Sequence, residues 1–327
     1  MIIGVTDHFR APFHVEAKAL GVDAEFVDFH SRNEADFDIA QLRRLDALLV
    51  WHARIGARTV DHLDNCKIVV RYGVGYDNID LEAFKARGLP LCNNPDYGSE
   101  EVANTTVALL LNLWRKISAY DFASREITQG WAENVLPPIS RISQSTLGLV
   151  GVGRIGGAVA RRMAPFGCRI LAYDPQLPPG QENQLDYQRV ASLEQLCAEA
   201  DAISLHCKLM PETAGMVNDR FLAAMKRGAI LVNTARGGLL ESLDAIERAL
   251  RSGQLAGAGL DALPQEPPGD HPLLRAWRKQ EAWVRGRLVV TPHTAWYSES
   301  SVLDMRHKAA QTIGLYLKDG TLRHRIV

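Results

Sequence analysis

The sequence of 327 residues lacks an excess of charge of either sign. It contains 37 lysine and arginine residues against 38 aspartate and glutamate residues, which leaves a formal net charge of −1. A nearly neutral chain produces no long-range field that would attract a nucleic acid or an anionic membrane. Neither partner is therefore expected, although a neutral total does not exclude a local basic patch.

Cysteine is scarce, and long hydrophobic runs are missing. The five cysteines are odd in number and none is spaced as C-x-x-C, so neither a disulfide framework nor a zinc site is expected. The N-terminus lacks the basic segment and apolar stretch of a signal peptide. The strongest apolar run, Val107–Trp114, is too short to span a bilayer. We expect a cytoplasmic protein with reduced thiols and no bound metal.

Short apolar runs alternate with amphipathic stretches almost throughout the chain. Most of these runs are apolar at nearly every position, which is typical of strands covered on both faces of a parallel sheet. The alternation predicts an α/β fold with right-handed crossovers. The candidate strands form two series, at 2–6, 25–29, 47–51, 68–71 and 89–93, then at 146–150, 169–173, 202–205, 229–233, 257–261 and 288–291.

The two series predict two domains, in keeping with a domain size of about 150 residues. A long helical stretch from Ser99 to about Ala119 separates them, and the chain ends in a helix from about Ser298. This last helix can pack back on the first series and make the first domain discontinuous. The predicted division is 1–97 with 296–327 for one domain and 98–295 for the other.

A glycine-rich motif begins the second domain's series of strands. The apolar run that ends at Val150 leads directly into Gly151-x-Gly153-x-x-Gly156 and a helical pattern. In this strand–turn–helix context the first glycine allows a tight turn, the second lets the backbone approach a pyrophosphate, and the third lets helix and strand pack closely. The helix N-terminus then offers N–H groups to the phosphates. The alternative is that a glycine-rich turn is only a turn.

An acidic residue stands where a dinucleotide site requires one. Asp174 ends the next strand, 18 residues after Gly156, near the usual spacing of about 20. A carboxylate at this point accepts hydrogen bonds from a ribose 2′-hydroxyl and repels a 2′-phosphate. The sequence therefore predicts NAD rather than NADP as the cofactor.

Three later strands are each followed by residues suited to hydride transfer. Arg236 follows one, Asp261 and Glu266 follow the next, and His293 follows the last. Reduction of a carbonyl requires a cation, a proton donor and a partner that orients the donor. Each residue taken alone also fits a structural role. Together, at the ends where parallel sheets bind ligands, they predict an active site.

These residues lie in motifs that identify a family resemblance. The segments GVGRIG, YDP, NTARGG, GAGLDALPQEP and TPHTAW resemble those of the D-isomer-specific 2-hydroxyacid dehydrogenases. RYGVGYDNID and NNPDYGSEEVANTTVALLLNLWR match in the first half, and RYGVGYDNID with TPHTAWYSES is similar to the C-terminal-binding-protein branch. The resemblance implies two Rossmann-like or flavodoxin-like domains with the active site in the cleft between them. It also implies a homodimer.

The resemblance assigns roles residue by residue. Arg236 would hold the substrate carboxylate and carbonyl, His293 would be the acid/base, and Glu266 would support it and raise its pKa. The remaining substrate contacts would be Val74, Gly75, Trp296 and His52. The cofactor contacts would be Gly151, Gly153, Arg154, Ile155, Gly156, Asp174, Thr106, Cys207, Thr213, Thr234, Ala235 and Asp261.

Departures from the family pattern leave alternatives open. Lys208 and Met210 replace common residues, and Lys208 either reaches the cofactor phosphates or is solvated. The long segment between Glu266 and His293 either borders the active site or packs elsewhere. Trp51 either lines an aromatic substrate pocket or belongs to the core. Arg54 either points inward, which would favour a second acidic group on the substrate, or faces solvent.

We expect an NAD-dependent oxidoreductase of class EC 1.1.1.- that transfers a hydride between nicotinamide and C2 of a D-2-hydroxy acid or 2-oxo acid. Glu266 argues against the related formate dehydrogenases, which pair their histidine with glutamine. The alternative is an NAD(H)-binding regulatory protein that resembles the corepressors and works through partners. The absence of a long tail beyond the last helix favours the enzyme.

Overall fold

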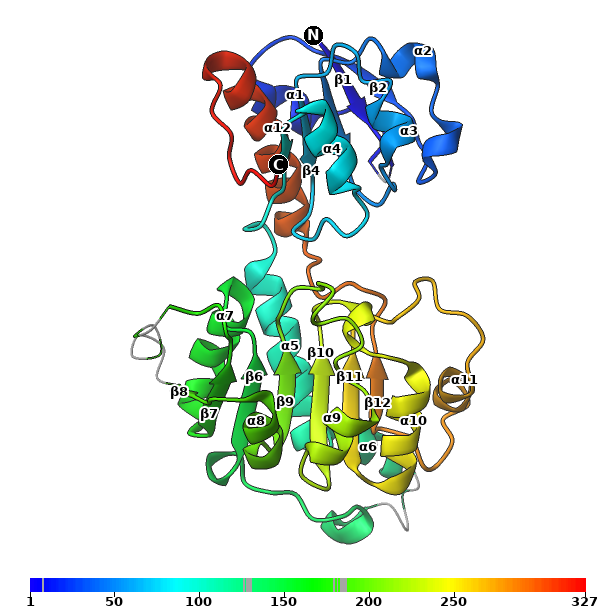
Figure 1. The fold of residues 1–327 in the computed structure, drawn as a ribbon. Coiled ribbons are helices and arrows are strands. Elements are labelled where there is room, and N and C mark those ends of the chain that lie inside the picture. The colour runs from blue at the N-terminus through cyan, green and yellow to red at the C-terminus, as the bar shows by residue number, and fades with distance from the viewer. Residues whose placement is uncertain (8, 126, 128–130, 179, 181, 183–186) are drawn as a thin grey trace. The chain divides into compact units, whose positions relative to one another are not determined.

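The computed structural model describes residues 1–7, 9–125, 127, 131–178, 180, 182 and 187–327. These residues form two compact units, Met1–Gly98 with Tyr297–Val327 and Ser99–Trp296. Each boundary lies one residue beyond the predicted one, so that Trp296 belongs to the second unit. Both units are built on an all-parallel sheet flanked by helices (Figure 1). The predicted α/β class with parallel sheets is confirmed.

The first unit has a five-stranded sheet in the order β2-β1-β3-β4-β5. The apolar runs of the first series form these strands at or near their predicted bounds. Strands β1, β3, β4 and β5 are almost entirely buried, whereas the edge strand β2 has exposed residues at both ends. The strands are β1 (Ile2–Val5), β2 (Glu25–Asp28), β3 (Ala47–Val50), β4 (Ile68–Arg71) and β5 (Leu91–Cys92), and the helices are α1 (His14–Leu20), α2 (Ile39–Leu42), α3 (Ala57–Val60), α4 (Leu81–Arg87) and α12 (Glu299–Asp319).

Helix α12 connects the end of the chain to the first unit. Ser298 caps its N-terminus by accepting a hydrogen bond from the backbone N–H of Ser301. A buried ion pair joins it to α1, with Arg306 Nε 2.7 Å from Glu16 Oε1, and the Tyr72 hydroxyl donates to the same oxygen. A Cβ at Gly314 would meet the Leu20 carbonyl oxygen at 2.5 Å, so the two helices approach closely at this glycine.

The second unit has a seven-stranded sheet in the order β12-β11-β10-β9-β6-β7-β8. Its strands are β6 (Thr146–Val150), β7 (Arg169–Tyr173), β8 (Gln188–Arg189), β9 (Ala202–Leu205), β10 (Ala229–Asn233), β11 (Leu255–Leu260) and β12 (Leu288–Val290). Its helices are α5 (Ser99–Trp114), α6 (Ile117–Ala123), α7 (Arg154–Met163), α8 (Leu193–Glu199), α9 (Asp219–Ala224), α10 (Leu243–Ser252) and α11 (Pro272–Arg278).

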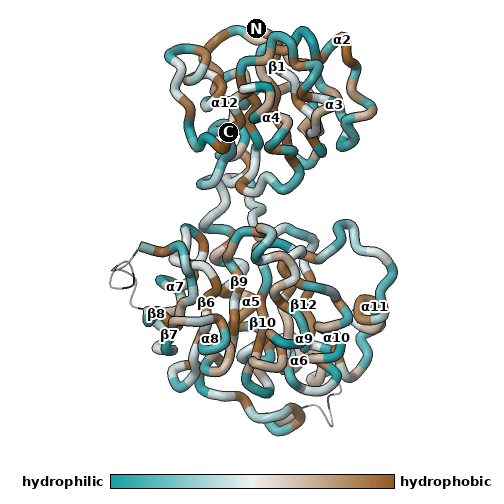
Figure 2. The backbone as a smooth tube through the Cα atoms, in the orientation of Figure 1, coloured by the Kyte–Doolittle hydropathy of each residue, from teal (hydrophilic) through white to brown (hydrophobic). Residues whose placement is uncertain are grey.

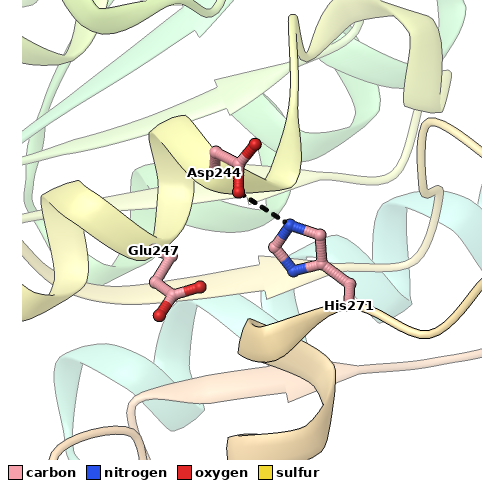
Figure 3. A group of neighbouring side chains, drawn as sticks. All are labelled: Asp244, Glu247 and His271. Atoms are coloured by element: carbon pink, nitrogen blue, oxygen red, sulfur yellow. Dashed lines mark hydrogen bonds and ion pairs between the residues drawn. The ribbon is translucent and has the colours of Figure 1, made fainter.

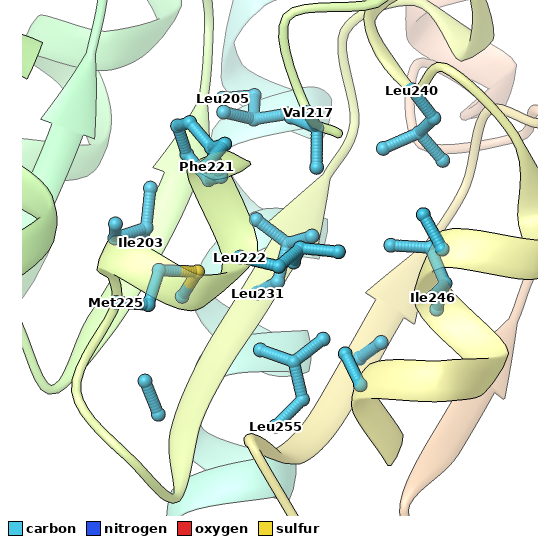
Figure 4. Close-up of a cluster of buried hydrophobic side chains, with 14 of the residues drawn as sticks. Ile203, Leu205, Val217, Phe221, Leu222, Met225, Leu231, Leu240, Ile246 and Leu255 are labelled. Carbon is cyan, nitrogen blue, oxygen red and sulfur yellow. The ribbon is translucent and has the colours of Figure 1, made fainter. Parts of the chain in front are cut away.

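A hydrophobic core on each face of this sheet explains its apolar strands. Leu231 of β10 packs into the core on the face covered by α9 and α10, where Figure 4 shows it among the buried side chains. Its neighbours Ile230 and Val232 belong to the core on the opposite face, with residues of α5 and α7. Figure 2 shows hydrophobic segments along the central strands of this sheet. Burial on both faces fixes where each strand ends, and therefore where the polar residues after it lie.

Two features differ from the sequence-based expectation. The predicted helical stretch from Ser99 to about Ala119 consists of two helices, because α5 ends at Trp114 and α6 begins at Ile117 and runs to Ala123. Between them Lys116 has a φ of 54°, and the Asn112 side chain accepts the Ser118 backbone N–H at 2.9 Å, which satisfies a free N–H at the start of α6. Strand β8 was not predicted, since its two residues are exposed and polar.

Among the residues that the structure describes, no helix combines the length and the apolar character needed to cross a membrane.

Candidate active site

The glycine loop between β6 and α7 has the shape that a dinucleotide requires. Gly151 has a φ of 89°, and a Cβ there would lie 2.8 Å from the Cys207 backbone nitrogen. A Cβ on Gly156 would overlap the Gly151 carbonyl oxygen. Gly153, by contrast, has open space where its Cβ would be. The backbone at the start of α7 is therefore accessible to a phosphate, and Arg154 and Ile155 form the first turn behind it.

Asp174 lies beside this loop, at the end of β7. Its Oδ2 atom accepts the Val152 backbone N–H at 3.0 Å, and its Oδ1 atom accepts the Gln176 N–H at 3.0 Å. The carboxylate is thereby fixed next to the position at which a glycine-loop ligand would bind. This placement fits the adenosine ribose of NAD.

His206 is a residue at this site whose role sequence reasoning missed. Burial lowers its pKa to about 3, which keeps the ring neutral, and its Nε2 atom is buried with no hydrogen-bond partner among the described residues. The His206 Cβ lies 3.4 Å from the place that a Cβ on Gly156 would occupy. A buried polar atom without a partner beside an open glycine loop supports a polar ligand there. His206 directly follows β9, and this position at a strand end could have indicated a site residue.

Other predicted cofactor residues lie around the same strand ends. Thr106 of α5 donates to the Val102 carbonyl at 2.7 Å, so Thr234 donates to Thr106 across a 2.7 Å contact. Cys207 is half-buried, and burial raises the pKa of its thiol to about 11. Thr213 donates to the Lys208 carbonyl at 2.7 Å and stabilises an exposed turn.

Arg236 lies in a loop that is closely packed against the loop after β11. A Cβ at Gly237 would overlap the Leu263 carbonyl, which shows how near the two loops are. The guanidinium donates to the Ala235 carbonyl at 2.8 Å, and the Arg236 carbonyl accepts the Asn233 side-chain amide at 2.9 Å. The loop is held by these bonds while the side chain remains half-buried.

His293 and Glu266 form a hydrogen-bonded pair. The Nδ1 atom of His293 lies 2.7 Å from Glu266 Oε2, and Glu266 Oε1 accepts the Leu263 N–H at 2.8 Å. Burial acts to raise the pKa of Glu266, but the hydrogen bond and charge of His293, the Leu263 N–H and the charge of Arg236 outweigh it, so the pKa lies below its ordinary value. The structure thus brings the three predicted catalytic residues together.

Asp261 and Trp296 hold the loop that carries His293. Asp261 is 1% exposed and accepts hydrogen bonds from Thr291 and from the backbone after His293. Trp296 donates from Nε1 to the His293 carbonyl at 2.9 Å. Trp296, which is predicted to contact the substrate, therefore also stabilises the loop that carries His293.

In the first unit, His52 is fixed by a buried aspartate that sequence reasoning missed. Asp7 follows β1, is 3% exposed, and accepts backbone N–H groups of His52 and Ala53 at 3.0 and 3.1 Å. The His52 Nδ1 atom lies 3.2 Å from Asp7 Oδ2. Burial lowers the pKa of His52, opposed by Asp7. Residue spacing did not predict that Asp7, at the end of β1, accepts hydrogen bonds from residues 45 and 46 positions later in the chain.

The loop with Val74 and Gly75 follows β4 in the first unit. Asn93 donates from its side chain to the Val74 carbonyl at 2.6 Å, and Asn94 N–H donates to the Gly73 carbonyl at 3.2 Å. Trp51 is buried at 3% exposure against Phe9, Tyr72 and Arg71, so packing accounts for it. Arg54 is exposed.

The segment between Glu266 and His293 packs within the second unit. The Arg287 guanidinium donates to four carbonyl groups, those of Leu250, Leu255, Ala256 and Trp283. Arg251 stacks on Trp283 with its Cζ atom 3.7 Å from the ring centroid. These bonds connect the segment to α10 and β11 and give it a structural role.

A second acid–histidine group lies on α10 and α11, shown in Figure 3. His271 Nδ1 accepts the Leu273 N–H at 3.1 Å as the cap of α11, so its Nε2 atom carries the proton and donates to Asp244 Oδ1 at 3.0 Å. Glu247 accepts from Arg251 at 2.8 Å. Metal binding through Nε2 would displace that proton and break the cap, so the group ties α11 to α10.

Fold and site together define a dinucleotide-binding protein with a histidine–glutamate pair beside a strand-end arginine. A family model described as D-isomer specific 2-hydroxyacid dehydrogenase, NAD binding domain, matches residues 107–295. The chain belongs to this family, and its second unit is an NAD-binding domain.

Similar proteins include enzymes of this family. D-3-phosphoglycerate dehydrogenase of Mycobacterium tuberculosis (strain CDC 1551 / Oshkosh) is 39% identical over 284 residues, which cover 86% of this chain and 51% of that protein. The chain thus spans about half the length of the curated relatives it matches. The comparisons give no support to the narrower resemblance to the C-terminal-binding-protein branch.

Solved structures match the whole chain. The TT0316 protein from Thermus thermophilus is 33% identical over 100% of both chains, with a TM-score of 0.84. The D-isomer specific 2-hydroxyacid dehydrogenase from Lactobacillus delbrueckii ssp. bulgaricus, in an NAD-complexed form, is 26% identical over 100% of both chains, with a TM-score of 0.78. The two-domain fold of this family is therefore the fold of this chain.

Proposed function

We propose that this protein is an NAD-dependent D-2-hydroxyacid dehydrogenase that works as a 2-oxo acid reductase. The observation that carries the proposal is the hydrogen-bonded pair of His293 and Glu266. The positive charge of Arg236 helps to lower the pKa of Glu266. All three residues belong to the same unit as the glycine loop. In this reaction a 2-oxo acid takes up one hydride and one proton to give a 2-hydroxy acid. The nicotinamide, when bound, supplies or accepts the hydride at C4.

His293 is assigned the proton transfer. Its Nδ1 atom is held by Glu266, so the Nε2 atom is the one that gives a proton to the carbonyl oxygen during reduction and takes it back during oxidation. Glu266 remains ionised because its pKa lies below its ordinary value, and its negative charge stabilises the protonated imidazole. Arg236 would bind the substrate carboxylate and polarise the carbonyl that receives the hydride.

The other proposed substrate contacts are Val74, Gly75 and His52 of the first unit and Trp296 of the second. The backbone N–H groups of Val74 and Gly75 would donate to the substrate carboxylate, since their loop is fixed by Asn93 and Asn94. His52, held by Asp7, would contact the substrate side chain. Trp296 would contact the substrate from the loop that carries His293.

The proposed cofactor contacts follow the strand ends of the second unit. Gly153 and the first turn of α7 would bind the pyrophosphate, and Asp174 would bind the ribose hydroxyls. The remaining contacts proposed are Gly151, Arg154, Ile155, Gly156, Thr106, Cys207, Thr213, Thr234 and Ala235.

Steady-state NADH oxidation with a panel of 2-oxo acids tests the proposal. The panel contains glyoxylate, hydroxypyruvate, phenylpyruvate, 2-oxo-4-methylthiobutyrate and 2-oxoglutarate, with NADPH in parallel. Turnover of at least one compound, lost in His293→Ala while NADH still binds, is the expected result. Turnover at the wild-type rate in His293→Ala would exclude the assigned role, and no turnover across a broad panel would count against the reductase.

We also propose that the enzyme is a homodimer. Ile117 and Trp131, which are 56% and 74% exposed, line one groove on the second unit with Tyr120 and Ile139. Covering such a surface in a dimer would remove apolar area from water. Light scattering coupled to size exclusion should give twice the chain mass, and Trp131→Glu should shift the mass towards the monomer.

A further inference from the structure

The carboxylate of Asp261 accepts three hydrogen bonds from the residues around His293. Its Oδ1 atom accepts the Thr291 hydroxyl at 2.6 Å and the Thr294 N–H at 2.9 Å, and its Oδ2 atom accepts the Ala295 N–H at 3.0 Å. Asp261 is 1% exposed. A carboxylate has about four acceptor positions, so three of them are already occupied by residues on either side of His293.

The backbone at His293 is in a conformation that requires such support. His293 has a φ of 55°, in the left-handed region that a residue with a side chain rarely adopts. Its N–H donates to the Asp261 carbonyl at 2.9 Å and to the Thr291 carbonyl at 3.0 Å. Strained residues of this kind persist where the surrounding bonds over-determine them. Asp261 supplies four of these bonds, one through its backbone and three through its side chain.

We propose that Asp261 is a positioning residue that acts through His293. It holds the turn from Thr291 to Ala295 so that the imidazole points its Nδ1 atom at Glu266. This inference rests on the proposed function, in which His293 transfers the proton. The family resemblance instead assigns Asp261 a contact with the cofactor. Altering a positioning residue should lower kcat, whereas altering a cofactor contact should raise the Kd of NADH.

The substitution Asp261→Asn separates the two roles. The amide nitrogen that replaces Oδ2 cannot accept the Ala295 N–H, so the turn loses one bond while the size of the side chain is kept. At saturating NADH we expect kcat to fall about 10- to 100-fold, since the lost bond involves a charged acceptor. The Kd of NADH, measured by its fluorescence, should stay within about twofold of the wild-type value.

Thr291 offers a matched pair of variants with a smaller risk of misfolding. Thr291→Val removes the hydroxyl that donates to Asp261 and keeps the shape, whereas Thr291→Ser keeps the hydroxyl. We expect Thr291→Val to lower kcat about 5-fold or more and Thr291→Ser to restore most of it, both with NADH affinity unchanged. An equal loss in both variants would show that the hydroxyl bond has no such role.

A readout that does not depend on turnover keeps this inference separate from the proposed function. The imidazole NMR signals of His293, assigned by their loss in His293→Ala, should change in position and titration in Asp261→Asn and Thr291→Val but not in Thr291→Ser. Unchanged signals, or a weaker NADH affinity with kcat intact, would overturn the positioning role. Failure of the wild type to reduce any 2-oxo acid would overturn the proposed function and leave this measurement valid.

Discussion

The Nδ1 atom of His293 lies 2.7 Å from Oε2 of Glu266, and this contact joins two loops whose residues are 27 positions apart in the chain. The Leu263 N–H occupies the other Glu266 oxygen at 2.8 Å, so the carboxylate cannot turn away without losing a bond. One side of the imidazole is thereby fixed, which leaves the other side for a proton transfer.

Replacing Glu266 by Gln should move the pH profile of 2-oxo acid reduction to lower pH. The amide oxygen can still accept a hydrogen bond from Nδ1, at the cost of the bond from the Leu263 N–H, and the protonated imidazole loses an adjacent negative charge. The midpoint of log kcat/KM against pH should therefore lie at a lower pH than in the wild type. Asp270→Asn, which changes an exposed carboxylate in the same segment, is the control. A profile identical to the wild type would rule out the pair.

Asp7→Asn should destabilise the protein by about 1–3 kcal/mol near neutral pH, because a buried acceptor of several N–H groups loses its charge. Burial acts to raise the pKa of Asp7, but hydrogen bonds from His52, Thr6 and Ala53 outweigh it, so the folded pKa is below its ordinary value. The carboxylate's contribution is therefore complete above the ordinary pKa and is lost as the pH falls through the lowered one.

Urea denaturation over a range of pH tests this expectation for Asp7. The stability difference between wild type and Asp7→Asn should be constant from neutral pH down to the ordinary carboxyl range and should shrink below it. Asp28→Asn, at an exposed position on β2, should match the wild type throughout. A difference that grows as the pH falls would contradict the direction of the Asp7 shift.

Asp174→Asn should weaken the preference for NADH over NADPH by about tenfold. The amide oxygen can still accept the Val152 N–H, at the cost of the bond from the Gln176 N–H, while the repulsion of a 2′-phosphate disappears. Fluorescence titration with each cofactor gives both affinities. Equal loss of both affinities, with no change in their ratio, would show that Asp174 only supports the loop.

Two glycines of the same loop should respond differently to alanine. In Gly156→Ala the new methyl group overlaps the Gly151 carbonyl, so thermal unfolding should show a loss of about 1–3 kcal/mol. In Gly153→Ala the methyl group enters open space, so stability should be retained while NADH binding weakens about tenfold or more. Normal NADH affinity in Gly153→Ala would mean that the pyrophosphate does not approach there.

Short-range patterns were sufficient for much of the fold. The apolar runs predicted β6, β7, β9 and β10 at their observed bounds, because strands covered on both faces are apolar at most positions. Strand β8 escaped prediction, since two exposed residues carry no apolar signal and pair only because β7 lies alongside. The break at Lys116 escaped as well, because its left-handed backbone does not interrupt the apolar spacing on either side.

Local patterns of residues located most of the strands, the glycine loop and the chemical kinds of side chain that follow each strand. Which of those side chains meet depends on how the strands and loops are arranged in space. Asp261 reaches Thr291 and Ala295 across about 30 residues of chain, and Asp7 reaches His52 across 45. Trp51 joins the core and Arg54 faces solvent, an outcome that spacing left open. The physical reason is that periodicity records whether a side chain is buried, whereas its hydrogen-bond partners depend on how separate strands and loops are brought together.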